Sequence, residues 1–310
     1  MDYEDKNKID GEKRAREIRE RLKMLITNSG IVPNIAIIQV GNDFASDKYV
    51  KRKIKVSAEL GIRMTLFHFE ERVAECDILS KIQELNNDKS MHGIMCQLPL
   101  PKHLNTFNIL NTISPEKDID GLTPFNAGLL HYSQVVPYIV DDVLNDKIDN
   151  NLLLNLGKNV AFIPCTPLGC LDLISKTFEE ENKEIKGKNA VVIGNSNLVG
   201  KPMSRLLTQS GATTTTLHSK SSNIDYAIKN ADVIVSATGV GQVLKKIKKD
   251  AILIDVAIRD NGKGGICGDL DYEKFIKKHK ITPVPKGVGP MTIACLMVNS
   301  YLACLHNEKR

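Results

Sequence analysis

Residues 34–53 read Asn-Ile-Ala-Ile-Ile-Gln-Val-Gly-Asn-Asp-Phe-Ala-Ser-Asp-Lys-Tyr-Val-Lys-Arg-Lys, and this stretch decides the fold. Its first part is almost entirely apolar, which is typical of a buried strand. A turn is predicted at residues 41–42, after which Ser46 or Asp47 can cap a helix that runs to about Leu60. A strand that feeds directly into a helix is the repeating unit of α/β proteins.

The predicted helix has one apolar face. Val50, Ile54 and Ala58 recur every four residues and predict its buried stripe. Tyr49 and Lys53 lie at the edge of this stripe, one turn apart. That position suits a partly desolvated lysine that meets a flat ligand. An isolated Tyr-x-x-x-Lys is, however, more often a tyrosine at the core margin and a snorkelling lysine, so this pair needs support from other motifs.

The rest of the first half continues the alternation. Helices are predicted at residues 11–27 and around residues 79–85, and strands at residues 63–69 and 93–98. Such alternation predicts parallel strands joined by right-handed crossovers, with ligands bound beyond the carboxyl ends of the strands. The stretch that contains Lys53 and the segment Gln97-Leu-Pro-Leu-Pro both leave such ends, so we expect them to face one cleft.

The composition indicates a globular protein with room for one large or two ordinary domains. The chain has 310 residues, of which 42% are apolar and 25% charged. The net charge of +5 is mild and interleaved with acids, which favours a small anionic ligand and argues against nucleic acid. We expect no apolar run of membrane-spanning length and no leader peptide. Seven dispersed cysteines indicate reduced thiols in a cytoplasmic compartment, with no metal site.

The second half predicts a nucleotide-binding domain. Residues 190–202 read as a buried strand, a glycine-bounded loop and a helix, an arrangement that offers backbone N–H groups to a phosphate. The spacing Gly194-x5-Gly200 differs from Gly-x-Gly-x-x-Gly, so the motif is weak by itself. A strand at residues 213–218 follows, and Ser219 and Lys220 come where a ribose-reading residue is expected.

Three other segments remain open to two interpretations. Gln97 either serves a site or satisfies loop backbone, and Asp120 belongs to a turn that matters only if it faces the same cleft. The turn at residues 283–292 is either a structural connection or lies beside a cofactor. Residues 132–156 are rich in Asn, Asp and Leu, and we assign them no chemistry.

Together these segments resemble the bifunctional methylenetetrahydrofolate dehydrogenase/methenyltetrahydrofolate cyclohydrolase family. The resemblance covers nearly the whole chain and rests on six motifs in a fixed order. They are Tyr49-x-x-x-Lys53, Gln97-Leu-Pro-Leu-Pro101, Pro115-Glu-Lys-Asp-Ile-Asp-Gly121, Pro164-Cys-Thr-Pro167, Gly194-x-Ser-Asn-x-Val-Gly-Lys-Pro202 and Pro283-Val-Pro-x-Gly-Val-Gly-Pro-Met-Thr292.

The resemblance implies an α/β fold with two domains: an N-terminal small parallel-sheet α/β domain and a C-terminal Rossmann-type NAD(P)-binding domain, with a cleft between them. Residues 1–125, joined by a C-terminal helix at 290–310, would form the folate-binding catalytic domain. Residues 126–157 would be a linker or insertion, and residues 158–289 the Rossmann domain.

The resemblance also implies the site residues. Lys53 would be the catalytic lysine, Gln97 would hold it in place, and Asp120 would anchor the pterin. The substrate would further contact Ser46, Tyr49, Leu98, Pro99 and Pro290. The cofactor would be held by Gly194, Asn195, Ser196, Val199, Gly200, Ser219, Lys220, Thr238, Gly239 and Ala257. No metal is implied.

The implied function consists of two reactions. The first oxidises 5,10-methylenetetrahydrofolate to 5,10-methenyltetrahydrofolate with NADP, or alternatively with NAD. The second hydrolyses this product to 10-formyltetrahydrofolate. These reactions belong to one-carbon metabolism and supply purine biosynthesis. The resemblance implies a cytoplasmic homodimer, joined through the Rossmann domain, whose partner is the small-molecule folate and neither nucleic acid nor membrane.

Some positions depart from the family pattern and leave alternatives. Lys286 and Ala257 stand where the family usually has Gly, Arg259 where it has Asn, and Asn195 where many members carry Arg. A monofunctional cyclohydrolase with a weakened dehydrogenase is therefore the nearest alternative. A nucleotide-sensing scaffold would explain only the second half. Dehydrogenases of 2-hydroxy acids would need an Arg-His-acid set, and short-chain dehydrogenases place Tyr-x-x-x-Lys after the nucleotide-binding strands.

Overall fold

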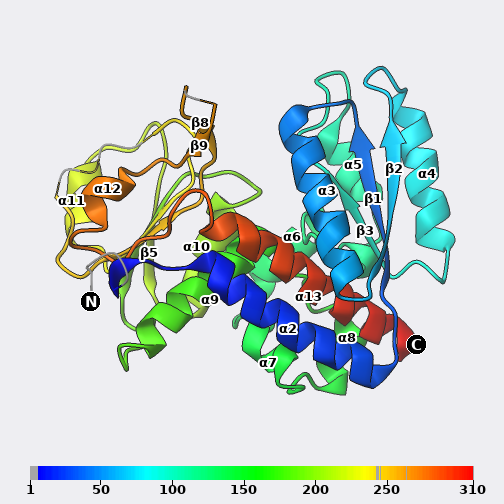
Figure 1. The fold of residues 1–310 in the computed structure, drawn as a ribbon, viewed down its shortest axis with the longest axis horizontal. Coiled ribbons are helices and arrows are strands. Elements are labelled where there is room, and N and C mark those ends of the chain that lie inside the picture. Colours follow the sequence, from blue (N-terminus) through cyan, green and yellow to red (C-terminus); the bar gives the residue numbers. More distant parts are fainter. Residues whose placement is uncertain (1–5, 242–243, 245, 263, 310) are drawn as a thin grey trace. The chain divides into compact units, whose positions relative to one another are not determined.

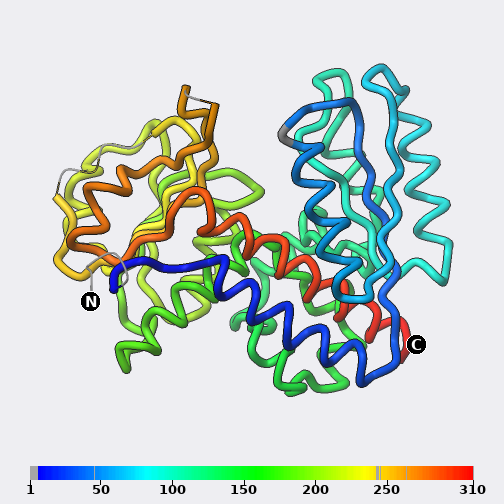
Figure 2. The backbone as a smooth tube through the Cα atoms, in the orientation of Figure 1, coloured from blue at the N-terminus to red at the C-terminus, as the bar shows by residue number. Residues whose placement is uncertain are grey.

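The structure is a computed structural model that describes residues 6–241, 244, 246–262 and 264–309 (Figures 1 and 2). The chain divides into two compact units, each built on a parallel sheet, so the predicted two-domain α/β class is confirmed. Unit 1 comprises Met1–Glu17, Gln134–Val136 and Thr166–Ala294, and unit 2 comprises Ile18–Ser133, Pro137–Cys165 and Cys295–Arg310.

Unit 2 contains a three-stranded parallel sheet in the order β2-β1-β3. Its strands are β1 (Asn34–Val40), β2 (Arg63–Phe69) and β3 (Gly93–Cys96). The predicted strands are confirmed, except that the third ends two residues before Leu98. Pro99 and Pro101 follow there, and proline cannot donate a ladder hydrogen bond.

Helices cover both faces of this sheet (Figure 1). The Ala36, Ile38 and Val40 side chains of β1 share a core with helices α4 (Glu75–Asn87) and α5 (Thr106–Thr112). Helix α3 (Phe44–Glu59) serves the opposite face, where Gln39 of β1 donates a hydrogen bond to Asp47. The alternation follows from the two-residue period of a strand.

Helix α3 begins earlier than the sequence predicts. Asp43 is its N-cap, and the Asp43 carboxylate accepts the Ser46 backbone N–H at 2.8 Å. The expectation that Ser46 or Asp47 caps the helix is therefore wrong. The predicted end at Leu60 is confirmed, and Gly61 follows with φ +78°.

The predicted buried stripe of α3 is also wrong. Ala58 is exposed and Ile54 is half-buried, whereas Ser46, Lys53 and Ser57 are buried beside Val50. The buried face of the helix is thus rotated about the helix axis relative to the predicted apolar stripe. Apolarity alone does not reveal it because three of its members are polar. Lys53 consequently lies within the buried face and not at its edge.

The remaining part of unit 2 is helical and includes most of the segment expected to be a linker. Residues 126–133 and 137–157 belong to this unit. Its short elements are the 3-10 helix η1 (Pro115–Lys117), α6 (Pro124–Tyr132), α7 (Val140–Leu144) and α8 (Asn150–Asn155). The Leu153 carbonyl of α8 contacts His306 Nδ1 at 2.5 Å.

Unit 1 contains a four-stranded parallel sheet in the order β5-β4-β6-β7. The strands are β4 (Asn189–Ile193), β5 (Thr213–Leu217), β6 (Val233–Ser236) and β7 (Ile252–Asp255). The strands predicted within residues 190–202 and at residues 213–218 are thus confirmed, the second one residue shorter than expected. Helix α10 (Gly200–Gln209) packs on β4 and β5, while α11 (Ile224–Lys229) and α12 (Tyr272–Phe275) contribute to a core on the sheet. Helix α9 (Cys165–Glu179) and the hairpin of β8 (Arg259–Asp260) and β9 (Ile266–Cys267) complete the described elements.

Two long helices begin in unit 1 and end in unit 2. They are α2 (Gly11–Ser29) and α13 (Val288–Glu308). By length and composition α13 could cross a membrane, so the expectation that no apolar run approaches that length is wrong. Most of α13 is buried by the rest of the chain, as is usual for a core helix of a globular protein.

Candidate active site and cofactor loops

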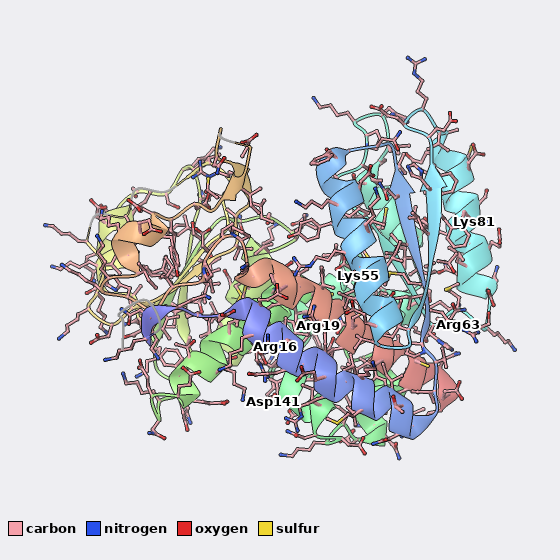
Figure 3. All side chains as sticks on the ribbon, in the orientation of Figure 1. Arg16, Arg19, Lys55, Arg63, Lys81 and Asp141 are labelled. Atoms are coloured by element: carbon pink, nitrogen blue, oxygen red, sulfur yellow. The ribbon has the colours of Figure 1, made fainter. Side chains whose placement is uncertain are left out.

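Lys53 is a charged residue that lies buried in unit 2. Its residue is 6% exposed, and Nζ donates to Gln97 Oε1 at 2.9 Å and lies 3.7 Å from Met95 Sδ. The neighbouring Lys55 is exposed, as lysines normally are (Figure 3). Burial lowers the pKa of Lys53 below its ordinary value, and the negative charge of Asp120 opposes part of that shift.

Gln97 follows β3 and orients the lysine. Its Nε2 donates to the Leu98 carbonyl at 2.7 Å, which leaves Oε1 directed at Lys53 Nζ. Because β1 and β3 are neighbours in the sheet, the segments that leave their carboxyl ends meet, as predicted. The expectation that Lys53 and Gln97 come together is confirmed by this hydrogen bond.

Asp120 approaches the same place from a tightly held turn. Asp118 pairs with Ile94 of β3, which brings the turn alongside the sheet. The buried Asp118 carboxylate accepts the backbone N–H groups of Leu122 and Thr123 at 3.1 and 2.8 Å. Asp120 lies close enough to Lys53 to influence the pKa of its amine, so the three expected catalytic residues are brought together.

The expected substrate-binding residues differ in their surroundings. Ser46 is buried on α3, and Tyr49 is half-buried one turn before Lys53. Burial raises the pKa of Tyr49, which the nearby charge of Arg52 partly opposes. Leu98 is half-buried and Pro99 exposed beside Gln97. Pro290 belongs to unit 1, where it is buried in the first turn of α13.

The predicted cofactor residues of unit 1 all follow carboxyl ends of its strands. The order β5-β4-β6-β7 reverses direction at β4, and ligands of doubly wound sheets bind at such a switch point. The segment 194–200 leaves β4, residues 219–220 leave β5, residues 238–239 leave β6, and Ala257 leaves β7. Four separate segments thus reach one edge of one sheet.

The loop after β4 folds back tightly on itself. Gly194 has φ +125°, and a Cβ on Gly200 would lie only 2.2 Å from the Gly194 carbonyl oxygen. Ser196 Oγ accepts the Val199 and Gly200 N–H groups at 3.2 and 3.4 Å, which closes the turn into α10. Asn195 and Ser196 are exposed. The loop is therefore a cradle that only glycine at position 200 permits, as phosphate-binding turns require.

The turn after β5 presents exposed polar groups. Ser219 and Lys220 are exposed, and the turn is closed because the His218 N–H donates to Ser221 Oγ at 2.9 Å. The Lys220 N–H donates to His218 Nδ1 at 3.2 Å. The Ser219 hydroxyl and the Lys220 ammonium are suited to a phosphate at a ribose, since neither is a carboxylate.

Asp269, which no sequence motif singles out, organises the loop after β6. Its buried carboxylate accepts the Thr238 N–H and Oγ1–H at 2.9 Å each, and the Gly239 and Gly241 N–H groups at 3.3 and 3.0 Å. Ser236 Oγ also donates to it, at 3.0 Å. Burial tends to raise the pKa of Asp269, but these hydrogen bonds together hold it below its ordinary value.

A second carboxylate supports Asp269 from β7. Asp255 accepts the N–H groups of Asp269 and Leu270 at 2.9 and 2.7 Å, and that of Ala257 at 3.3 Å. Burial raises the pKa of Asp255 to about 6. Arg259 donates to the Gly268 carbonyl at 3.0 and 2.6 Å and lies 3.6 Å from Asp269. The guanidinium therefore has a structural partner within this loop cluster.

Lys286 has a conformation that glycine adopts more easily. Its φ is +82°, its side chain is exposed, and its carbonyl accepts the Glu12 N–H at 3.0 Å. At the next position a Cβ on Gly287 would lie 2.3 Å from the Pro283 carbonyl oxygen. A non-glycine residue in the left-handed region is strained, so this departure from the family pattern has a local cost.

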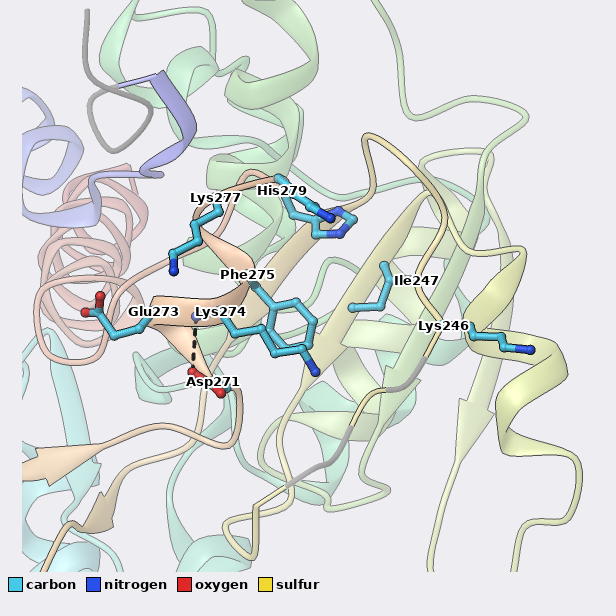
Figure 4. A pocket seen from close by; sticks show the side chains of 9 residues that line it. Lys246, Ile247, Asp271, Glu273, Lys274, Phe275, Lys277 and His279 are labelled. Atoms are coloured by element: carbon cyan, nitrogen blue, oxygen red, sulfur yellow. Dashed lines mark hydrogen bonds between the residues drawn. The ribbon is translucent and has the colours of Figure 1, made fainter.

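A pocket elsewhere on unit 1 has a different character (Figure 4). Four lysines contribute to its wall, and Lys274 Nζ lies 5.1 Å from the centre of the Phe275 ring. The Lys274 N–H donates to Asp271 at 3.2 Å. None of the predicted cofactor residues lines this pocket, so it is separate from the loops described above.

His92, Cys304 and Glu308 bring possible metal-ligand atoms within 4.8 Å of one another. The Asn34 N–H donates to His92 Nδ1 at 2.9 Å. The neutral ring therefore carries its proton on Nε2, and neither nitrogen offers a free lone pair. The chemistry of this group does not suit a metal ion.

Comparisons with known proteins agree with this geometry. Residues 9–120 match the profile of the tetrahydrofolate dehydrogenase/cyclohydrolase catalytic domain, and residues 164–308 that of the corresponding NAD(P)-binding domain. Proteins described as bifunctional protein FolD are similar over the whole chain. The one from Rickettsia bellii is 42% identical over 96% of this chain and 98% of its own, and the one from Staphylococcus epidermidis is 40% identical over 95% of each.

Solved structures of the same enzymes share the fold. The Campylobacter jejuni bifunctional enzyme FolD superimposes with a TM-score of 0.82, at 36% identity over 96% of this chain and 98% of its own. The Trypanosoma brucei enzyme, solved with NADP and an inhibitor, has a TM-score of 0.80 at 29% identity and covers 96% of this chain and 97% of its own.

Proposed function

This chain belongs to the tetrahydrofolate dehydrogenase/cyclohydrolase family, and from that premise we propose that it catalyses both reactions of the bifunctional enzyme. It oxidises 5,10-methylenetetrahydrofolate to 5,10-methenyltetrahydrofolate with NADP and hydrolyses the methenyl product to 10-formyltetrahydrofolate. The observation that carries the proposal is the buried Lys53 amine, paired with Gln97 and lowered in pKa.

Lys53 provides the proton transfers of the hydrolysis. Burial disfavours the ammonium form of Lys53, so a larger share of this amine is neutral and able to accept a proton than for an ordinary lysine at the same pH. The cationic methenyl carbon attracts water, from which Lys53 takes a proton. As the bond between that carbon and the ring nitrogen breaks, the nitrogen takes up the proton held by Lys53, and the added hydroxyl loses its remaining proton to solvent to become the formyl oxygen. Gln97 holds the amine in place through the 2.9 Å hydrogen bond.

We assign the binding of the folate to the other residues around Lys53. Asp120 accepts N–H groups of the pterin, for which a carboxylate is well suited. Tyr49 stacks on the flat ring system, and Ser46, Leu98 and Pro99 line the same site. Pro290 is assigned to the substrate on the resemblance alone.

The loops at the carboxyl edge of unit 1 would hold NADP, whose bound nicotinamide supplies a hydride acceptor. The cradle of Gly194, Ser196, Val199 and Gly200 fits a pyrophosphate because it lies at the start of α10, where the helix dipole favours an anion. Asn195 lies in the same exposed loop. Ser219 and Lys220 would read the 2′-phosphate of the adenosine ribose, while Thr238, Gly239 and Ala257 would flank the cofactor.

Turnover of 5,10-methylenetetrahydrofolate tests the proposal, with NADP and NAD supplied separately and absorbance followed. We expect reduced NADP to form without lasting absorbance from the methenyl intermediate, because hydrolysis removes it. If neither cofactor is reduced while added 5,10-methenyltetrahydrofolate is still hydrolysed faster than in buffer, the dehydrogenase half of the proposal fails. If neither reaction exceeds its rate in buffer, the whole proposal fails.

We propose a homodimer joined through unit 1. Strand β5 is at the edge of its sheet, and an edge strand offers unpaired backbone groups to a second copy. The other edge strand, β7, is partly covered because Leu253 pairs with Ile281. Light scattering that gives the mass of one chain, 34.3 kDa, at micromolar concentration would contradict a stable dimer.

We propose a cytoplasmic location and a role in the one-carbon metabolism that supplies purine biosynthesis. All seven cysteines are free thiols, which suits a reducing compartment. The product, 10-formyltetrahydrofolate, is chemically a formyl donor. Deletion of the gene should therefore create a requirement for purines that formyl donors relieve, and growth without that requirement would contradict the assigned role.

A further inference from the structure

Tyr138 and Asn299 form a buried hydrogen-bonded pair in unit 2. Tyr138 comes from residues 132–156, to which the sequence assigns no chemistry, and Asn299 lies in α13. Tyr138 is 3% exposed and Asn299 is 0% exposed, and Tyr138 Oη donates to Asn299 Oδ1 at 2.8 Å. Polar groups this deep cost free energy unless they are paired, so their partners indicate what the pair does.

The partners are two stretches of backbone. Asn299 Nδ2 donates to the Ile119 carbonyl at 2.9 Å and to the Ile163 carbonyl at 3.0 Å, which uses both of its amide hydrogens. The Ile163 N–H donates to Tyr138 Oη at 2.8 Å. The pair thus replaces the hydrogen bonds that a neighbouring strand would supply, and it clamps residue 119 against residue 163.

The clamped carbonyl belongs to the peptide that immediately precedes Asp120. The Cys165 thiol also donates to it, at 3.4 Å. On the other side of Asp120, a Cβ on Gly121 would lie 2.7 Å from both the Phe162 carbonyl oxygen and the Pro164 nitrogen. Both ends of the Asp120 backbone are therefore fixed, although its side chain is only half-buried.

We propose that Tyr138 and Asn299 are positioning residues of the folate site, which hold the backbone at Ile119 so that the Asp120 carboxylate faces the pterin. This inference rests on the role of Asp120 in the proposed function. Tyr138 and Asn299 act through Asp120, and small displacements of a binding carboxylate are costly because the hydrogen bonds to a heterocycle depend on direction.

Tyr138→Phe tests the proposal because it removes one oxygen atom that both donates to Asn299 and accepts from Ile163. We expect the dissociation constant for tetrahydrofolate, measured by fluorescence, to rise about tenfold. That is the effect expected when the displaced Asp120 carboxylate loses one well-placed hydrogen bond to the pterin. The KM for NADP should stay within about twofold. Ser300→Ala is the matched control, since Ser300 is equally buried on α13 but donates only to Leu296, at 2.7 Å, within its own helix.

A double-mutant cycle separates positioning from general support. In an Asp120→Ala background, Tyr138→Phe should change the dissociation constant by less than about twofold, because the group through which it acts is gone. A full tenfold effect in that background would overturn the positioning role alone. An unchanged dissociation constant in Asp120→Ala by itself would overturn both this proposal and the assigned role of Asp120.

A second variant, Asn299→Ser, is available if Tyr138→Phe does not fold. Asn299→Ser keeps a hydroxyl donor and leaves Tyr138 intact, so it can take the place of Tyr138→Phe in the same cycle. Melting curves of every variant show whether it is folded at the assay temperature. The same criteria then apply: coupling with Asp120 supports the proposal, and additivity overturns it.

Discussion

Lys53 combines a functional advantage with a cost in stability. A buried amine must lose its hydration, and the hydrogen bond to the Gln97 side-chain oxygen compensates only in part. Its lowered pKa makes the amine a usable base, but it also means that the unfolded chain binds a proton more readily than the folded chain. The folded state therefore loses stability as the pH falls below the ordinary pKa of lysine.

Lys53→Met should abolish hydrolysis of 5,10-methenyltetrahydrofolate and raise stability. The methionine fills similar space without a charge, so we expect a melting temperature at least about 2 °C higher at neutral pH. The advantage should shrink as the pH rises toward the ordinary pKa of lysine. Folate should still bind. Activity and melting curves measure both effects, and full hydrolysis by the variant would refute the assignment of Lys53.

Asp120 should set the pH at which hydrolysis begins. Its negative charge raises the pKa of Lys53 against the effect of burial, so Asp120→Asn should lower that pKa further. The neutral amine would then be present at lower pH, and the acid limb of the rate at saturating folate should move toward lower pH. A limb that stays in place or moves to higher pH would show that Lys53 is not the titrating base.

Replacing Lys286 by glycine should stabilise the folded chain. A non-glycine residue at φ +82° costs about 1–2 kcal/mol, part of which is returned because glycine is freer in the unfolded chain. We expect Lys286→Gly to raise the free energy of unfolding in urea by about 0.5–1 kcal/mol. Gly287→Ala should lower it, because a Cβ there meets the Pro283 carbonyl oxygen at 2.3 Å. Equal stability of both variants would contradict this interpretation.

At the scale of elements, the apolar strands could be predicted and the polar contacts between distant segments could not. A strand such as β4 is a short apolar run, so its bounds follow from local sequence. The buried face of α3 could not be predicted, because Lys53 and Ser57 are buried by their tertiary surroundings despite their polarity. The burial of such polar residues depends on contacts with distant segments, which the periodicity of apolar residues does not report.

Asp269 shows the same limit for the cofactor site. It lies about thirty residues after the loop that it holds, and no short motif connects the two. Its local sequence, Gly268-Asp269-Leu270, shows only an acidic residue after a glycine, which is a common pattern in turns. Asn299 was equally hidden, as one amide inside an apolar helix. Predicting either would have required knowing which strands are neighbours.

Asp269→Asn should weaken cofactor binding selectively. Asparagine has one acceptor oxygen where the carboxylate accepts several N–H and O–H groups, so the loop from Thr238 to Gly241 should lose its shape. We expect the KM for NADP to rise about tenfold or more, with hydrolysis of added 5,10-methenyltetrahydrofolate unchanged. Asp260→Asn is the control, since that exposed carboxylate accepts the Gly262 N–H in the neighbouring hairpin and does not contact the loop from Thr238 to Gly241 among the described residues. Equal losses in both reactions would indicate general destabilisation.

At the scale of the whole molecule, NADP should stabilise the entire chain. A ligand at one hundred times its dissociation constant adds about 2.7 kcal/mol to the folded state. Helices α2 and α13 each belong to both units, so unfolding of either unit would break helices that the other needs. We expect one calorimetric transition that moves as a whole with NADP. Two transitions, of which only one responds, would contradict this expectation.

The division of the chain also has a genetic consequence. Unit 1 is made of three separate stretches of sequence, and so is unit 2. A deletion that removes either α2 or α13 therefore takes residues from both units at once. A lineage that loses one activity and keeps the other should do so through point substitutions and not through loss of one of these helices.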